Sequence, residues 1–114
     1  MKPEFLPGRE QARVEEPKVT GYLLNSDHPV GGPKARFFLS RGFQLADWEG
    51  LADALRLHAQ NNPISGIRTT QFATSYSLDC HLVTPDRSSP CIRTVWEVRA
   101  DDRRPRLITA HPLR

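Results

Sequence analysis

The spacing of apolar residues predicts two helices in the first half of the chain. Between Asp47 and Gln60 apolar residues recur at intervals of three and four, and on a helix they would form one stripe: Trp48, Leu51, Ala52, Leu55 and Ala59. An earlier helix is predicted from about residue 33 to residue 41, because Pro33 fits the first helical position and Gly42 is typical of a left-handed helix end. Each helix would place one apolar face on a core.

After Pro63 the apolar period changes to about two, which is typical of strands. Four such segments are predicted, over residues 64–70, 74–83, 91–99 and 106–111. The longest connection between them, residues 84–90, is rich in turn-forming residues. This order of elements predicts an α+β fold in which two N-terminal helices pack on one face of a four-stranded antiparallel β-meander.

The chain of 114 residues is long enough for one domain. Residues 1–17 mix Pro, Glu and Arg without an apolar period, so we expect a flexible tail there and a single α+β domain over residues 18–114. No apolar run approaches the roughly 20 residues that a membrane-spanning helix needs, and the N-terminus has no signal-peptide core. We therefore expect a cytoplasmic protein without a membrane partner.

The cysteines and the central histidine favour packing roles. Cys80 and Cys91 have neither the number nor the spacing of a disulfide framework or a zinc site, so we expect them to be reduced and buried. His58 lies beside the apolar stripe of the second predicted helix and is interpreted as a packing or surface histidine. No cofactor and no metal are expected.

The formal net charge of +3 is distributed unevenly along the chain. From Arg87 onward there are seven arginines against three carboxylates, Glu97, Asp101 and Asp102. Arginine suits bidentate phosphate recognition, but it also forms ordinary ion pairs. The charge permits an anionic partner and does not require one.

The stretch 28–38 combines the start of a helix with two residues that can handle a phosphate. Gly31 and Gly32 allow a tight turn, and the first N–H groups of the helix would point back toward His28. Lys34 falls on the first turn, near the positive end of the helix dipole. These features predict a small anion site, and the alternative is an ordinary capped helix with a solvated Lys34.

Six short motifs are spread along the chain: Tyr22-Leu23-Leu24, His28-Pro29-Val30-Gly31, Lys34-Ala35-Arg36-Phe37-Phe38, Gly42-Phe43, Arg93-Thr94-Val95-Trp96 and Pro105-Arg106-Leu107-Ile108-Thr109-Ala110-His111-Pro112. Together they resemble a family of short uncharacterised bacterial proteins that has no settled activity. The similarity covers about residues 22–112. More distantly, the layout is similar to the barnase, EndoU, colicin and RelE type of ribonuclease fold, which recurs in the toxin domains of contact-dependent toxins and in toxin–antitoxin pairs. This chain departs from that pattern at His111, where a tyrosine is usual.

The distant resemblance implies RNA as a candidate substrate, and the chain can be tested against that chemistry. Cleaving RNA without a metal needs a base, an acid, and cations or N–H donors for the charge on phosphorus. His28 could act as the acid or the base, because an unperturbed histidine titrates near neutrality. Lys34 and the N-terminus of its helix could hold the phosphate. The alternative is that His28 is an ordinary loop residue.

Four further candidates fall on the last two predicted strands, which can bring them onto one face. Arg93 would neutralise the phosphate, and Thr94 and Thr109 would donate hydrogen bonds. His111 would be the second proton-transfer group. The alternatives are that Arg93 is a solvated sheet residue and that both threonines simply favour strand structure.

Two functional hypotheses follow. The first is a small ribonuclease-like toxin domain that cleaves RNA without a metal and has a cognate antitoxin or immunity protein as its partner. The second is a non-catalytic binding, accessory or immunity module that uses a basic C-terminal face to bind a protein or a nucleic acid. Convergence of the candidate residues on one concave surface would favour the enzyme.

Overall fold

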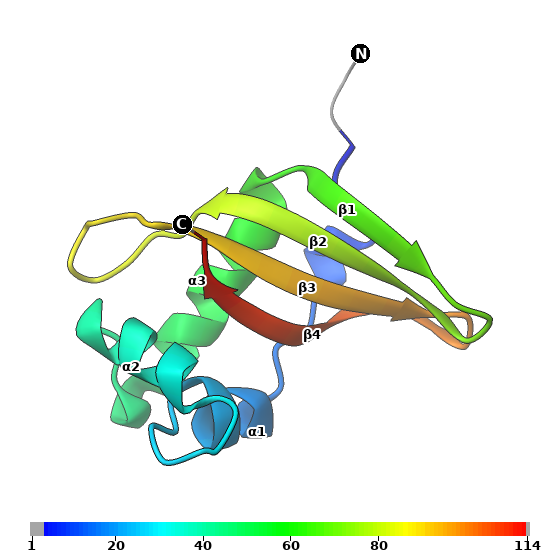
Figure 1. Cartoon of the computed structure of the whole chain (residues 1–114). Coiled ribbons are helices and arrows are strands. Elements are labelled where there is room, and N and C mark those ends of the chain that lie inside the picture. Colours follow the sequence, from blue (N-terminus) through cyan, green and yellow to red (C-terminus); the bar gives the residue numbers. More distant parts are fainter. Residues whose placement is uncertain (1–3, 114) are drawn as a thin grey trace.

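The computed structural model describes residues 4–113 and confirms an α+β fold with helices N-terminal to the strands (Figure 1). The two predicted helices are present as α2, Gly32–Ser40, and α3, Trp48–Asn61, each within one residue of its predicted bounds. A third helical segment precedes these two and overlaps residues 18–24, for which the sequence left an extended or a helical segment open. It consists of α1, Glu16–Lys18, which continues into a π-helical turn, η2, Val19–Leu23. Two short 3-10 turns, η1, Arg9–Gln11, and η3, Leu45–Asp47, complete the helical elements of the described residues.

The strands form one antiparallel meander in the order β1-β2-β3-β4. Their bounds are Ile64–Thr69, Ala73–His81, Cys91–Arg99 and Asp102–Pro112. β4 begins earlier than predicted, because Asp102 already pairs with Arg99 across a tight turn. α3 crosses one face of the sheet, and α1 and α2 lie beside the β4 edge (Figure 1). Within residues 4–113 no helix covers the opposite face, which is called the open face below.

The core lies between the helices and the covered face of the sheet. Its largest fully buried apolar side chains come from α2, α3 and three strands: Phe38, Leu51, Leu55, Leu78, Ile92, Trp96 and Leu107. Since side chains alternate between the two faces of a strand, residues next to these on β3 and β4 point to the open face. The core therefore fixes which polar side chains are available on that face.

A series of buried hydrogen bonds crosses this core. Trp96 Nε1 donates to Thr94 Oγ1 at 2.9 Å, and Thr94 Oγ1 lies 3.1 Å from Nδ1 of His58. The other ring nitrogen of His58 lies 3.0 Å from the carbonyl oxygen of Cys80. His58 is thus a packing residue, one of the two interpretations drawn from the sequence. Burial lowers the pKa of His58, because the charged ring would lose its hydration.

Residues 4–17, for which composition predicts a flexible tail, make specific contacts in the structure. Leu6 and Val14 are buried in the core. Arg13 forms a parallel bridge to β4, with its N–H donating to the Pro105 carbonyl at 2.8 Å and its carbonyl accepting from Leu107 N–H at 3.0 Å. This bridge protects part of an edge strand that would otherwise present unpaired backbone groups.

Cys80 and Cys91 are free and half-buried. They were predicted to be reduced and buried, and the structure buries each only in part, because they lie near the ends of β2 and β3 where the loop 82–90 begins and ends. Over residues 4–113, no helix combines the length and the apolar character needed to cross a bilayer. In the same residues, no three His, Cys, Asp or Glu side chains are grouped as metal ligands.

Candidate active site at the edge of the sheet

Three side chains from separate elements meet at the β4 edge. The ammonium group of Lys34, on α2, donates to the hydroxyl of Tyr22 at 2.6 Å and to the hydroxyl of Thr109, on β4, at 3.2 Å. The two hydroxyl oxygens are 3.5 Å apart. All three residues are half-buried, so the cluster is open to solvent. A partly desolvated cation beside two hydroxyl groups is suited to an anionic ligand.

A β-bulge brings Thr109 to this position. Val95 on β3 pairs with Thr109 while the next residue, Trp96, pairs with Leu107, so Ile108 is an extra residue on β4. Bulges re-aim neighbouring side chains and are common beside functional sites. Leu107 and Ala110 stay buried on either side of the bulge, which leaves Thr109 on the open face.

Tyr22 is positioned by the π-helical turn and by a glycine. The N–H of Leu24 bonds to the carbonyl of Val19 at 2.8 Å, a spacing of five residues that widens the helix at this point. The Tyr22 ring packs directly on Gly31, where a Cβ atom would lie 2.7 Å from ring atom Cδ1. Tyr22 was not predicted to be a site residue, although it belongs to the Tyr22-Leu23-Leu24 motif.

His28 caps the start of α2. Its Nδ1 accepts the backbone N–H groups of Val30 at 3.0 Å and of Gly31 at 2.9 Å. A nitrogen that accepts these bonds carries no proton, so the network assigns the ring proton of neutral His28 to Nε2. The ring packs edge-on against Tyr22 with 5.0 Å between centroids. His28 therefore supports Tyr22 and offers an N–H donor.

The backbone amides of the predicted anion site are used within the turn itself. Val30 and Gly31 donate to the His28 ring, and Gly32 donates to the His28 carbonyl at 2.9 Å. These three N–H groups are not free for a phosphate. Of the groups in the predicted anion site, the Lys34 ammonium is therefore the one that can still bind an anion.

The environment of Tyr22 alters its acidity. Burial raises the pKa of Tyr22, but hydrogen bonds with Lys34 and Thr109 and the positive charges of Lys34 and Lys18 lower it by more. The net effect is a pKa below the usual value of 10.0. A tyrosine of this kind is a better proton donor than an exposed one, because the nearby cations stabilise its phenolate.

Arg93 and His111 continue the site across the open face. The strand register pairs Arg93 with His111 on β4 and with Asp79 on β2, so the three residues form a row. Arg93 makes two bonds to the Asp79 carboxylate, from Nε at 2.8 Å and from Nη2 at 2.9 Å. The bonds from Arg93 lower the pKa of Asp79 and raise that of Arg93. The guanidinium group is thus held in one orientation.

The neutral ring of His111 carries its proton on the other nitrogen than the ring of His28 does. Its Nδ1 lies 3.2 Å from the carbonyl oxygen of Pro112, and a carbonyl oxygen can only accept. The contact therefore assigns the proton of the neutral ring to Nδ1 and leaves the lone pair on Nε2. His111 follows Thr109 by two residues, so both side chains lie on the same face of β4.

The structure separates Thr94 from the other five candidates. Thr94 is fully buried on the covered face, bonded by Trp96 and His58, and has no access to a substrate. Thr109 links the rest, since Lys34 bonds to it from one side and His111 lies beside it on the other. The register places Arg93 next to His111, and His28 caps the N-terminus of α2, the helix that carries Lys34.

A family model described as a domain of unknown function, DUF6883, matches residues 5–114. The chain belongs to this family. A comparison of the DUF6883 chain with curated proteins finds no match. A solved structure does resemble it, a contact-dependent growth inhibition toxin–immunity protein complex from Klebsiella pneumoniae 342. A chain of that complex superposes with a TM-score of 0.70 at 17% identity, over 94% of this chain and 97% of that one. At this identity the likeness shows a shared fold.

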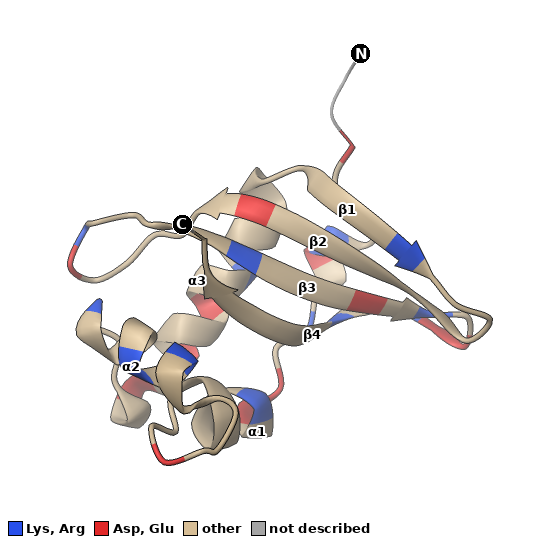
Figure 2. Cartoon of the chain, viewed as in Figure 1, with Lys and Arg blue, Asp and Glu red and all other residues tan. Residues whose placement is uncertain are grey.

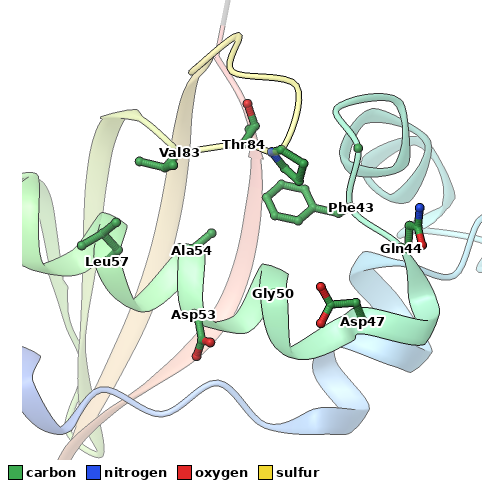
Figure 3. A pocket seen from close by; sticks show the side chains of 11 residues that line it. Phe43, Gln44, Asp47, Gly50, Asp53, Ala54, Leu57, Val83 and Thr84 are labelled. Carbon is green, nitrogen blue, oxygen red and sulfur yellow. The ribbon is translucent and has the colours of Figure 1, made fainter.

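A separate pocket of about 540 Å³ lies at the other end of α2 in the DUF6883 domain (Figure 3). Its walls are the exposed face of α3 and the loop after β2, and its apolar lining includes Phe43, Leu57 and Val83. Asp47 and Asp53 are the ionisable residues among those that line it. None of the six candidate residues contributes to this pocket, which is therefore distinct from the β4 cluster.

Proposed function

We propose that this DUF6883 domain cleaves RNA phosphodiester bonds without a metal ion and acts as the toxic member of a toxin–immunity pair. The contact that carries the proposal is Lys34 bonded to both Tyr22 and Thr109, beside two histidines with opposite ring protonation. The proposed biological role is supported by the fold shared with a chain of a contact-dependent growth inhibition toxin–immunity complex. An immunity protein is accordingly the proposed protein partner.

In the proposed mechanism the 2′-oxygen of RNA attacks the adjacent phosphorus and the 5′-oxygen leaves. His111 is the base, since its Nε2 lone pair is free to take the 2′-hydroxyl proton. Tyr22 is the acid that protonates the leaving oxygen, because its own hydrogen is left free by the bond it accepts from Lys34. The products are a 2′,3′-cyclic phosphate and a free 5′-hydroxyl group.

The remaining residues stabilise charge or position the reacting groups. Lys34 faces the negative charge that grows on the phosphate oxygens and on the Tyr22 oxygen. Arg93, whose charge is balanced by Asp79, supplies oriented N–H donors rather than net positive charge, and Thr109 donates a hydrogen bond. His28 holds the Tyr22 ring and presents its Nε2–H to a phosphate oxygen. Thr94 has no role in this chemistry.

The alternative, a binding module with a basic C-terminal face, has less support. Four of the arginines after residue 87 are paired with carboxylates at 2.8 to 3.2 Å: Arg93, Arg99, Arg104 and Arg106. Basic and acidic positions accordingly alternate over this part of the sheet (Figure 2). Paired arginines offer less net charge to an anionic partner than the sequence count implies.

The proposal is tested with purified protein and total bacterial RNA, in parallel reactions with and without excess EDTA. We expect discrete cleavage by the wild type and by the control Arg36→Met, which removes an exposed cation from the same helix. Lys34→Met should abolish it while the protein stays folded. Intact RNA after incubation with folded wild-type protein would overturn the ribonuclease proposal and favour a binding or immunity role. Cleavage that stops only in EDTA would overturn its metal-independent chemistry.

A further inference from the structure

A hollow of about 400 Å³ opens on the sheet beside the candidate active site. It is lined by residues of three strands: Gly66, Ile67, Arg68, Ser75, Ser77 and Val95. The hollow exists because its central positions are small, with no side chain at Gly66 and short ones at the two serines. None of its lining residues belongs to the proposed catalytic set.

The strand register aligns this hollow with the cluster at the β4 edge. Thr109 pairs with Val95, Val95 pairs with Ser77, and Ser77 pairs with Gly66. These four residues form one row across the whole sheet. Because neighbouring strands are about 4.8 Å apart, the row places Ser77 about 10 Å and Gly66 about 14 Å from Thr109. A base attached to the sugar next to the scissile phosphate can reach the part of the hollow formed by Val95 and Ser77, and its outer edge then faces Gly66.

The lining offers the groups that a nucleobase needs. Val95 gives an apolar surface for the face of a base, and it shares the open face with Ser75, Ser77 and Arg68. The Ser75 and Ser77 hydroxyls make no hydrogen bond within residues 4–113, so they are free to bond to a base edge. Arg68 is exposed and forms no ion pair with any described residue, which leaves its guanidinium group for stacking or for a flanking phosphate.

We propose that this hollow binds the nucleobase adjacent to the scissile phosphate and so selects where RNA is cut. The inference rests on the proposed function, since it takes the Lys34–Thr109 cluster as the position of the phosphate. The site would be selective for single-stranded RNA, because a base must leave a helical stack to lie flat on the sheet.

Gly66→Leu is the decisive variant, because it fills the hollow without disturbing the fold. A Cβ atom at Gly66 would meet only Ser77, at 3.8 and 3.9 Å, which are ordinary contacts. Thr69→Leu is the matched control, since it enlarges an exposed residue of the same strand outside the hollow. Ser77→Ala is a second variant that removes one free hydroxyl without adding volume to the hollow.

The first measurement is titration of the 15N-labelled protein with AMP, CMP, GMP and UMP, which needs no cleavage. We expect at least one nucleotide to shift the amide resonances of Gly66, Ser75 and Ser77 in the wild type and in Thr69→Leu. Gly66→Leu should weaken that binding at least tenfold, and Ser77→Ala should weaken it less. Shifts that avoid the hollow, or equal affinity in Gly66→Leu, would overturn the inference.

A cleavage assay separates this inference from the proposed function. Gly66→Leu should raise the KM for a short single-stranded RNA about tenfold and change the preferred cleavage position. Unchanged KM and cleavage pattern would overturn the base-binding role while the ribonuclease proposal stands. Nucleotide shifts at the hollow without any cleavage by the wild type would support the binding site and overturn the ribonuclease.

Discussion

The ammonium group of Lys34 donates a hydrogen bond to the Thr109 hydroxyl 3.2 Å away, although 75 residues separate them in the chain. This contact ties the first turn of α2 to the edge strand of the sheet. It also connects two groups of candidate residues, since Tyr22 and His28 contact the Lys34 side and His111 lies on the Thr109 side. One cation therefore organises the whole site.

Replacing Lys34 should change the acidity of Tyr22. Lys34→Met removes a hydrogen bond and a positive charge that lower the pKa of Tyr22, so that pKa should rise toward or above 10.0. The measurement is an alkaline ultraviolet titration of tyrosinate in a Tyr76→Phe background. Lys18→Met, which removes only a more distant charge, should raise the pKa by less. An unchanged titration in Lys34→Met would show that the contact does not hold in solution.

Gly31 should be intolerant of any side chain. Its backbone is unstrained, but the Cβ of Gly31→Ala would fall 2.7 Å from the Tyr22 ring and displace it. We expect a loss of about 1–3 kcal/mol in the free energy of unfolding, as for overpacked sites, together with loss of RNA cleavage. Gly21→Ala is the control, because no atom lies within 4 Å of its added Cβ. Equal urea midpoints for the two variants would contradict this account.

Much of the fold could be predicted because local patterns determine it. The stripe from Trp48 to Ala59 and the alternation after Pro63 indicate elements whose apolar faces must be covered, and only a few layouts achieve this. The structure adds what local patterns do not contain. Leu6 and Val14 are isolated apolar residues in a polar segment, so no period marks them as core residues.

The sequence predicted those residues of the candidate site whose type and local position alone indicate their chemistry. Lys34 and His28 stand out at a helix start, but Tyr22 depends on a π-helical turn, and such turns have no clear sequence signal. Adjacent residues on a strand face opposite sides, so a one-residue difference separates the half-buried Arg93 on the open face from the fully buried Thr94. The bulge at Ile108 then decides the direction of Thr109.

Two threonine variants should separate folding from activity. Thr94→Val keeps the shape but leaves Trp96 Nε1 and His58 Nδ1 without their buried partner, which should cost about 1–3 kcal/mol for each unpaired group. Thr109→Val removes a half-buried hydroxyl. It should lower the free energy of unfolding less than Thr94→Val does, and it should reduce RNA cleavage more. Urea unfolding and the RNA assay, run on both variants, check this. A greater loss of cleavage in folded Thr94→Val than in Thr109→Val would place Thr94 in the reaction. A greater loss of stability in Thr109→Val than in Thr94→Val would contradict the structural role of Thr94.

The free energy of unfolding should fall in mild acid because of His58. Burial lowers the pKa of His58 below 6.5, while backbone carbonyls and the charge of Asp79 raise it only in part. The unfolded chain then binds a proton more readily than the native one. Stability is complete above about pH 6.5 and is lost as pH falls from there toward the native pKa of His58. Urea unfolding at about pH 7.5 and about pH 5.5 measures the difference. The exposed His81 is the control. His81→Gln should keep the acid-induced decrease in the free energy of unfolding, and His58→Gln should reduce it. The same decrease in both variants would assign the effect to other groups.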